Sequence, residues 1–116
     1  MTIQEQYENL EKTVRGYNPA ADFQHIRAAF EFAAEAHKDQ KRKSGEPYII
    51  HPLAVAQIVA EELRLDSESI EAALLHDVIE DTAATHEQVS KLFSPTIADL
   101  VEGVSKLTRI QYATKE

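Results

Sequence analysis

The nine residues from 74 to 82, Leu-Leu-His-Asp-Val-Ile-Glu-Asp-Thr, constrain this chain more than any other stretch. An apolar run that favours a helix contains the pair His76 and Asp77 and, three residues later, the pair Glu80 and Asp81. Because residues three or four apart share a helix face, the stretch gathers one imidazole and three carboxylates at one helix end. Carboxylates this close repel one another, and burying them is costly unless a cation neutralises them. The stretch therefore indicates either a divalent metal site or a solvated last turn whose acids face water.

A second histidine, His51, favours the metal site. It directly precedes Pro52, a residue that suits the first turn of a helix. A lone histidine there is more often a capping or core residue than a ligand. Together, however, His51, His76 and Asp77 offer two imidazoles and a carboxylate. This donor set suits manganese, iron or zinc better than calcium or magnesium.

The basic residues are concentrated in one segment. Positions 38 to 43 hold four of the 12 Lys and Arg residues, in a chain whose formal net charge is −8. The turn-forming residues Ser-Gly-Glu-Pro follow, so we predict a loop over residues 38–48. Two interpretations are open. The segment is a solubilising loop, or it is the entrance for a phosphate-bearing ligand, with Arg42 stacking on a base or binding an oxyanion.

Composition limits the classes of protein and partner. A chain of 116 residues with 43% hydrophobic residues forms one small domain with a real core. Its acidic balance argues against nucleic acid or a membrane surface as partners. The chain has no cysteine, no signal-peptide pattern and no apolar run near the ~20 residues of a membrane span. We expect a soluble, cytoplasmic protein.

Apolar residues recur every three or four positions along the chain, and no segment alternates as a strand would. The sequence therefore predicts an all-α fold of about six helices, two of them short. We expect these helices over residues 3–14, 19–37, 52–63, 67–77, 86–92 and from 95 to beyond 104. In the third helix, we expect the buried side to comprise Leu53, Val55, Ala56, Ile58, Val59 and Leu63. Asp66 is expected to cap the fourth helix, and Thr85 with Gln88 forms a capping-box pattern before the fifth.

An early histidine, a later His-Asp pair and a helical scaffold resemble the HD phosphohydrolase superfamily. The longer strings at residues 42–53, 74–82 and 103–107 closely resemble the hydrolase domain of the RelA/SpoT family. That domain removes the 3′-pyrophosphate from the alarmone (p)ppGpp in the stringent response. The resemblance runs from about Tyr17 to Leu107, in the same order and spacing. It implies an HD-domain helical bundle, and the first residues look more like a long bifunctional family member than a stand-alone hydrolase.

The resemblance also implies a catalytic centre. In that family, the residues matching His51, His76 and Asp77 bind a manganese ion. Those matching Glu80 and Asp81 serve the attacking water and the 3′-pyrophosphate.

The implied substrate is a small guanine nucleotide, ppGpp or pppGpp, which yields GDP or GTP and pyrophosphate. Arg42 would stack on the guanine, and Lys43 and Ser44 would line the nucleotide pocket. Two alternatives stay open: an HD phosphohydrolase acting on another nucleotide, and a catalytically silent HD module that senses nucleotide or binds a partner.

The chain departs from the family in one respect. The family's hydrolase domain is longer, and its fourth metal ligand is an aspartate in a later Asp-Arg-Leu-His-Asn-like motif. This chain reaches Glu116 without that motif, and Asp99 is its only nearby acidic residue of similar type. We therefore expect residues 1–116 to be the N-terminal part of the domain, truncated before its end. An incomplete metal shell and an exposed apolar face are expected to weaken activity and to favour self-association.

Overall fold

The computed structural model describes residues 2–82 and 84–103. Its elements are α1 (Ile3–Tyr17), α2 (Phe23–Ala36), α3 (Ile50–Ile58), the π-helical turn η1 (Val59–Leu63), α4 (Ser67–Leu75), α5 (Val78–Asp81) and α6 (His86–Leu92). Residues 95–103 are also helical. Within the described ranges, one isolated bridge between Lys41 and Pro47 is the only strand-like pairing. The predicted all-α class is confirmed.

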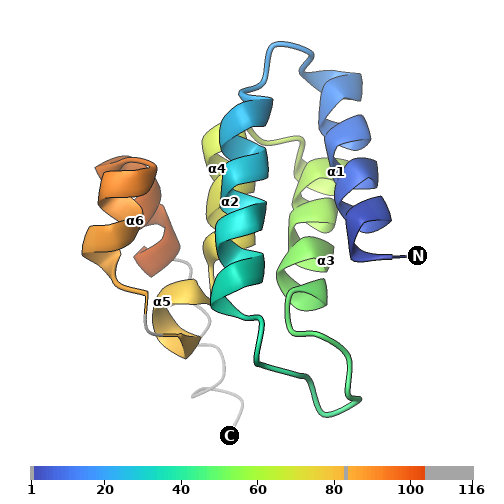
Figure 1. The fold of residues 1–116 in the computed structure, drawn as a ribbon. Helices are drawn as coiled ribbons and strands as arrows, with labels where there is room; N and C mark the ends of the chain where they lie inside the picture. Colours follow the sequence, from blue (N-terminus) through green and yellow to red (C-terminus); the bar gives the residue numbers. More distant parts are fainter. Residues whose placement is uncertain (1, 83, 104–116) are drawn as a thin grey trace, which may run out of the picture.

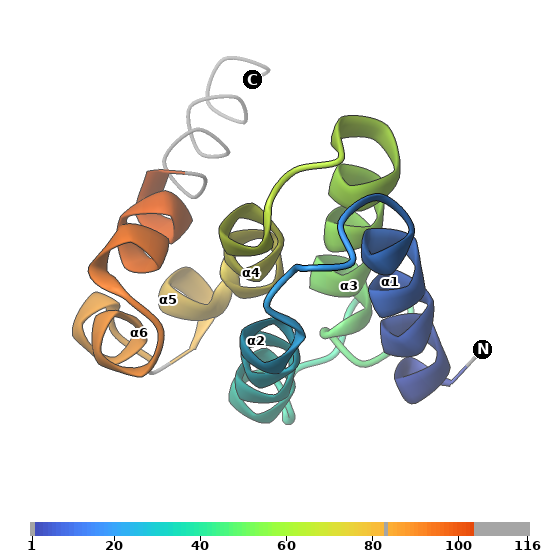
Figure 2. The ribbon, with the colours of Figure 1, turned by 90° about the horizontal axis from the view of Figure 1, so that it is seen from above.

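Helix α4 is the central element of the fold. It packs against α2 and α3, and α3 in turn packs against α1. Figures 1 and 2 show these four helices as one bundle, with α6 and the helical residues 95–103 on the other side of α4. Six consecutive residues of α4 are buried, from Ile70 to Leu75. Because α4 is surrounded by other elements, it is held in place on all sides and can position a site at its end rigidly.

The second helix begins at Phe23, so the predicted start at Pro19 is wrong. The Asp22 carboxylate accepts a hydrogen bond from the His25 backbone N–H, which makes Asp22 the N-cap. The Asp22 backbone N–H also donates to Ser67 Oγ at 2.9 Å, at the start of α4. The Asp22 cap, which is also bonded to α4, fixes the start of α2 more firmly than the backbone preference of Pro19 does. Pro19 lies in the preceding turn.

The buried side predicted for the third helix is only partly correct. Leu53, Ala56 and Ala60 are buried at spacings of three and four, whereas Ile58 is 58% exposed. Ile58 lies two positions from both alanines, which places it on the opposite helix face. Leu63 is 61% exposed. The hydrogen-bonded ring of the π-helical turn η1 contains one more residue than that of an α-helix, so the side chains at its end, including Leu63, point in a different direction.

The fourth helix ends at Leu75, so the predicted continuation through residue 77 is wrong. His76 is its C-cap, and Asp77 is the N-cap position of the short helix α5. The His76 backbone N–H points to the carbonyl of Ala73, three residues back. This tighter closure ends the α-helical ladder. The two residues therefore occupy a junction between helices.

Most of the C-terminal predictions are confirmed where the structure describes them. The Asp66 cap and the capping box of Thr85 with Gln88 are both present. Among residues 95–103, Ile97 and Val101 are buried, but Leu100, which was expected beside them, is exposed. Predicted positions from 104 onward lie outside the described residues.

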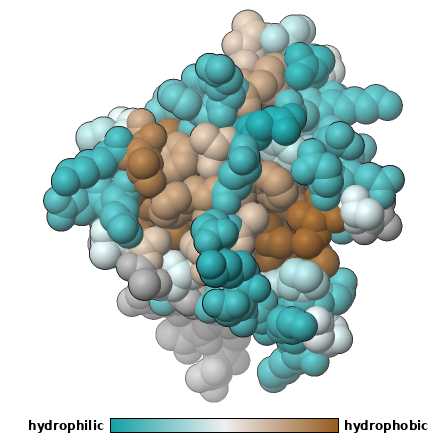
Figure 3. Space-filling model, viewed as in Figure 1, coloured by the Kyte–Doolittle hydropathy of each residue, from teal (hydrophilic) through white to brown (hydrophobic). Residues whose placement is uncertain are grey.

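Large apolar side chains reach the surface at several places. Figure 3 shows brown, hydrophobic side chains between teal, hydrophilic ones on one face. The largest exposed apolar residues described are Ile58, Leu63, Leu65, Leu92 and Leu100. Self-association through such a face stays a prediction. In the part of the chain that the structure describes, no helix has the length and apolar character needed to cross a membrane.

One acidic residue is buried inside the bundle. The Glu71 side chain on α4 is 1% exposed, and its Oε1 has no hydrogen-bond partner among the described residues. Burial, followed by the charges of Asp22, Glu68 and Asp66, raises the pKa of Glu71 from 4.5 to about 7. The folded state thus holds this proton more tightly than the unfolded state. Stability is therefore lost as the pH rises from about 4.5 towards 7.

We predict that Glu71→Met, which keeps the length of the side chain, stabilises the protein at high pH. The gain over the parent should grow by up to ~3 kcal/mol between pH 5 and pH 8, because only the parent must then bury or protonate a carboxylate. Urea unfolding at the two pH values measures it. The exposed Glu62→Met is the control, with no such growth expected. An equal gain at both pH values for Glu71→Met would contradict the assignment.

Candidate metal centre and nucleotide cavity

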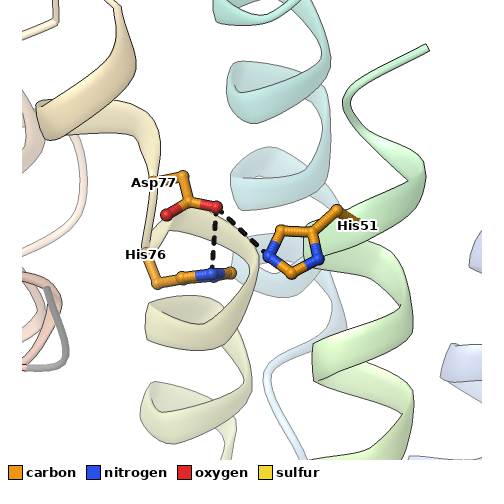
Figure 4. A group of neighbouring side chains, drawn as sticks. All are labelled: His51, His76 and Asp77. Atoms are coloured by element: carbon orange, nitrogen blue, oxygen red, sulfur yellow. Dashed lines mark ion pairs between the residues drawn. The ribbon is translucent and has the colours of Figure 1, made fainter. Parts of the chain in front are cut away.

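The three predicted metal ligands meet where α3 packs against the end of α4. His51 lies in the first turn of α3, and His76 and Asp77 form the junction between α4 and α5. Asp77 Oδ2 is 3.4 Å from His51 Nε2 and 3.1 Å from His76 Nε2. Figure 4 shows the one carboxylate oxygen facing both rings. Residues 25 positions apart in sequence are thus brought together by helix packing.

His76 is held in the form that a metal requires. Its side chain is nearly buried, and its Nδ1 lies 2.7 Å from the backbone carbonyl oxygen of Ala73. A carbonyl oxygen can only accept a hydrogen bond, so Nδ1 carries the proton. Nε2 then faces Asp77 Oδ2, to which it donates a proton when the ring is charged, and it would offer its lone pair to a metal ion bound between the two. An imidazole oriented by a backbone carbonyl is the usual arrangement of a metal-binding histidine.

Asp77 is partly buried and remains a carboxylate. Burial acts to raise its pKa, but the hydrogen bond and charge of His76 act against it, as do the Tyr48 hydroxyl and the charge of His51. Together these groups hold the pKa of Asp77 below its ordinary value. The group is therefore anionic across the neutral pH range.

The donor atoms fit a divalent transition-metal ion. One donor atom each from His51, His76 and Asp77 lies within 4.8 Å of the other two. Two imidazole nitrogens and one carboxylate oxygen form a mixed set that suits such metals. Three protein ligands also leave coordination positions for water and substrate, as catalytic sites require.

The predicted loop over residues 38–48 forms one wall of a cavity beside this centre. The Arg42 backbone N–H donates to the Glu46 carbonyl at 2.9 Å, and Gly45 has a φ of 89°, so the loop closes as a tight turn. The cavity measures about 750 Å³ and is lined by Lys41, Arg42, Lys43, Ser44, Glu46, Tyr48, Ile50 and His51. The three predicted nucleotide contacts and one predicted metal ligand therefore share a single space.

The predicted catalytic acids lie within one helical turn after the predicted metal ligand Asp77. Helix α5 begins at the residue after Asp77 and contains Glu80 and, as its last residue, Asp81. Glu80 is exposed. The roles assigned to these two acids stay predictions.

Asp99 does not join the predicted metal ligands in the structure. Its Oδ1 lies 3.0 Å from Nε2 of His86, and Glu102 Oε2 lies 3.4 Å from the same nitrogen. These three exposed or half-exposed groups form a second His–carboxylate cluster between α6 and residues 95–103. The cluster is largely solvent-exposed, and exposed acidic groups of this kind commonly occur without a metal ion.

Sequence reasoning missed two residues beside the centre. The Tyr48 hydroxyl donates a hydrogen bond to Asp77 Oδ2 at 2.8 Å. The Tyr48 ring lies against that of His37, which is buried at the end of α2. No periodicity marks either residue. The only available signal was the position of Tyr48, three residues before His51 and next to the start of α3.

We predict that Mn²⁺ stabilises this chain against unfolding through the three ligands. At a free concentration 100 times the dissociation constant, the free energy of unfolding should rise by ~2.7 kcal/mol. His76→Ala should abolish the rise, and His86→Ala, in the second cluster, should leave it in place. Thermal unfolding with and without Mn²⁺ checks this. Equal stabilisation of the parent and His76→Ala would show that the ion binds elsewhere.

Comparison with known proteins agrees with this architecture. A family model described as "HD domain" matches residues 29–116. The chain is 48% identical over 110 residues to the bifunctional (p)ppGpp synthase/hydrolase SpoT of Escherichia coli K12, covering 95% of this chain and 16% of that protein. It is 50% identical over 109 residues to the guanosine-3′,5′-bis(diphosphate) 3′-pyrophosphohydrolase of Aquifex aeolicus, covering 94% and 15%.

A solved structure extends the comparison to the fold. It is described as a metazoan ortholog of SpoT that hydrolyses ppGpp, and it matches with a TM-score of 0.67 and 38% identity. The match covers 70% of this chain and 47% of the other. The chain thus spans about a sixth of the length of the curated relatives named above. On the family match and the shared fold, the chain belongs to the HD domain family, where its relatives are SpoT-type proteins.

Proposed function

We propose that this chain is part of a manganese-dependent (p)ppGpp 3′-pyrophosphohydrolase. The observation that carries the proposal is the shared cavity, in which His51 of the metal centre and the basic residues Arg42 and Lys43 line one space. A site for a nucleotide with two pyrophosphate groups needs cationic side chains beside a metal. The names of the relatives supply the substrate class.

The proposed reaction is hydrolysis at the 3′ position. The oxygen of water attacks the phosphorus attached to O3′, the P–O3′ bond breaks, and O3′ takes up a proton. ppGpp and water thus give GDP and pyrophosphate. A bound divalent cation supplies Lewis acidity to a phosphoryl oxygen and lowers the pKa of water.

The chain's own residues divide the remaining work. Arg42 and Lys43 place the nucleotide by charge, and the planar guanidinium of Arg42 also suits stacking on guanine. Ser44 contributes a hydroxyl to the same wall of the cavity. Glu80 and Asp81 orient the attacking water and accept its proton. Their position in the last two residues of α5, the helix that begins just after the proposed ligand Asp77, supports this assignment.

The wider setting belongs to the same proposal. This chain acts in the cytoplasm as one part of a bifunctional RelA/SpoT protein. Its partner is the guanine nucleotide; nucleic acid and membranes are not expected partners, which the net charge of −8 supports. Exposed apolar residues such as Leu92 support self-association of this piece alone.

We predict that the chain, extended through the later aspartate motif of its family, releases GDP and pyrophosphate from ppGpp with Mn²⁺. Arg42→Ala should raise KM ~10-fold or more, because a charge-assisted contact to the substrate is lost. Lys91→Ala, which removes an exposed cation of α6, is the matched control and should leave KM unchanged. Chromatography of the nucleotide products gives both values.

Two outcomes of this assay would contradict the proposal. One is an extended chain that binds Mn²⁺ and ppGpp but leaves the nucleotide intact, which would favour a silent sensing module. The other is hydrolysis of a different nucleotide at the same efficiency by the parent and by Arg42→Ala.

A further inference from the structure

His37 is a buried polar residue that the proposed mechanism does not use. It is the C-cap of α2 and is 1% exposed. Its Nδ1 is hydrogen-bonded to the side-chain oxygen Oε1 of Gln40, and its buried Nε2 has no hydrogen-bond partner among the described residues. A buried nitrogen without a partner is costly, so apolar packing alone would be served better by a hydrocarbon ring.

The His37 ring lies against Tyr48. The two ring centroids are 4.7 Å apart, with the planes tilted by 34°. On another side, the Tyr48 ring meets His51 edge-on, with centroids 5.9 Å apart. Packing on two sides restricts χ1 of Tyr48, the rotation that would move its hydroxyl oxygen, and so holds that oxygen in place.

Gln40 holds the same two residues through the backbone. The Gln40 N–H donates to the His37 carbonyl at 2.9 Å, and the Tyr48 N–H donates to the Gln40 carbonyl at 3.1 Å. Gln40 therefore ties the His37 ring by its side chain and the Tyr48 backbone by its carbonyl. His37, Gln40 and Tyr48 form one connected unit, which we term the His37 brace.

The brace ends on a metal ligand. The Tyr48 hydroxyl donates to Asp77 Oδ2, the oxygen that also faces Nε2 of both His51 and His76. A hydroxyl facing a carboxylate can only donate, so this contact fixes the rotation of the carboxylate toward the two imidazoles. Hydrogen bonds to a ligating carboxylate typically change metal affinity 10- to 100-fold.

We propose that His37 is a positioning residue of the metal centre, acting through Tyr48 to orient Asp77 for the metal. Tyr48 also lines the cavity of the basic loop, so the brace couples that cavity to the metal ligand. The inference rests on the proposed function only in that Asp77 binds a metal. It assigns a role to a side chain that touches neither metal nor substrate.

The test is a double-mutant cycle on Co²⁺ affinity, measured by calorimetry in the His86→Ala background to remove the second cluster. Tyr48→Phe should weaken binding ~10-fold, because it deletes only the hydroxyl. His37→Ala should weaken binding several-fold, and His37→Phe should recover only part of the loss, because it restores the ring against Tyr48 but not the hydrogen bond to Gln40. In the Tyr48→Phe background, His37→Ala should cause no further loss, because its effect passes through that hydroxyl.

Tyr17→Phe is the matched control. It deletes a hydroxyl that donates to the Leu65 carbonyl at 2.7 Å, away from the centre, and should leave Co²⁺ affinity unchanged. The absorption spectrum of bound Co²⁺ should change in Tyr48→Phe and His37→Ala but not in Tyr17→Phe. A merely structural His37 would lower stability without changing this spectrum.

Three outcomes would overturn the inference, and they are distinguishable. Unchanged Co²⁺ affinity in Tyr48→Phe removes the connection to Asp77, even if His37→Ala fails to fold. Additive losses in the double variant show that His37 does not act through Tyr48. A parent that binds no Co²⁺ overturns the proposed metal centre as well, whereas the first two outcomes leave it intact.

Discussion

The packing of α3 against α4 is the constraint on which the proposed site depends. It brings His51, at the start of one helix, to the oxygen of Asp77 just beyond the end of the other. Leu53 and Ala56 of α3 and Leu74 of α4 are all buried in the same hydrophobic core. A helix pair packed at native density holds its end residues within a fraction of an ångström, the tolerance that a metal site needs.

That geometry has an electrostatic consequence. A partly buried carboxylate at Asp77 is surrounded by groups that favour its charged form, and the buried His76 is held with its Nε2 facing that carboxylate. The donor atoms are thus already gathered in the geometry that a bound cation would need. The basic loop adds positive charge next to this centre, because its side chains line the cavity on the His51 side. Among the described residues, the basic side chains of the loop lie beside the anionic Asp77 centre, so the phosphates and the metal ion of a nucleotide complex would each have groups of opposite charge.

Much of this could be read from the sequence, and the exceptions have physical causes. Periodicity predicted the helices because burial of one face dictates the apolar spacing, and capping signals located Asp66 and Thr85 correctly. The start of α2 was misplaced because the Asp22 cap depends on a contact with Ser67, 45 residues away. The break at His76 was missed because a helix end inside an apolar run leaves no local sign. Tyr48 and His37 were missed because their partners come from tertiary packing.

Pulsed electron paramagnetic resonance of the Mn²⁺-loaded chain tests the central claim most directly, because it counts the imidazole nitrogens bound to the ion. The account predicts coupling to two imidazoles in the parent and to one in His51→Ala, since His51 and His76 each present one nitrogen to the centre. Absence of nitrogen coupling in the parent, or an unchanged spectrum in His51→Ala, would contradict it.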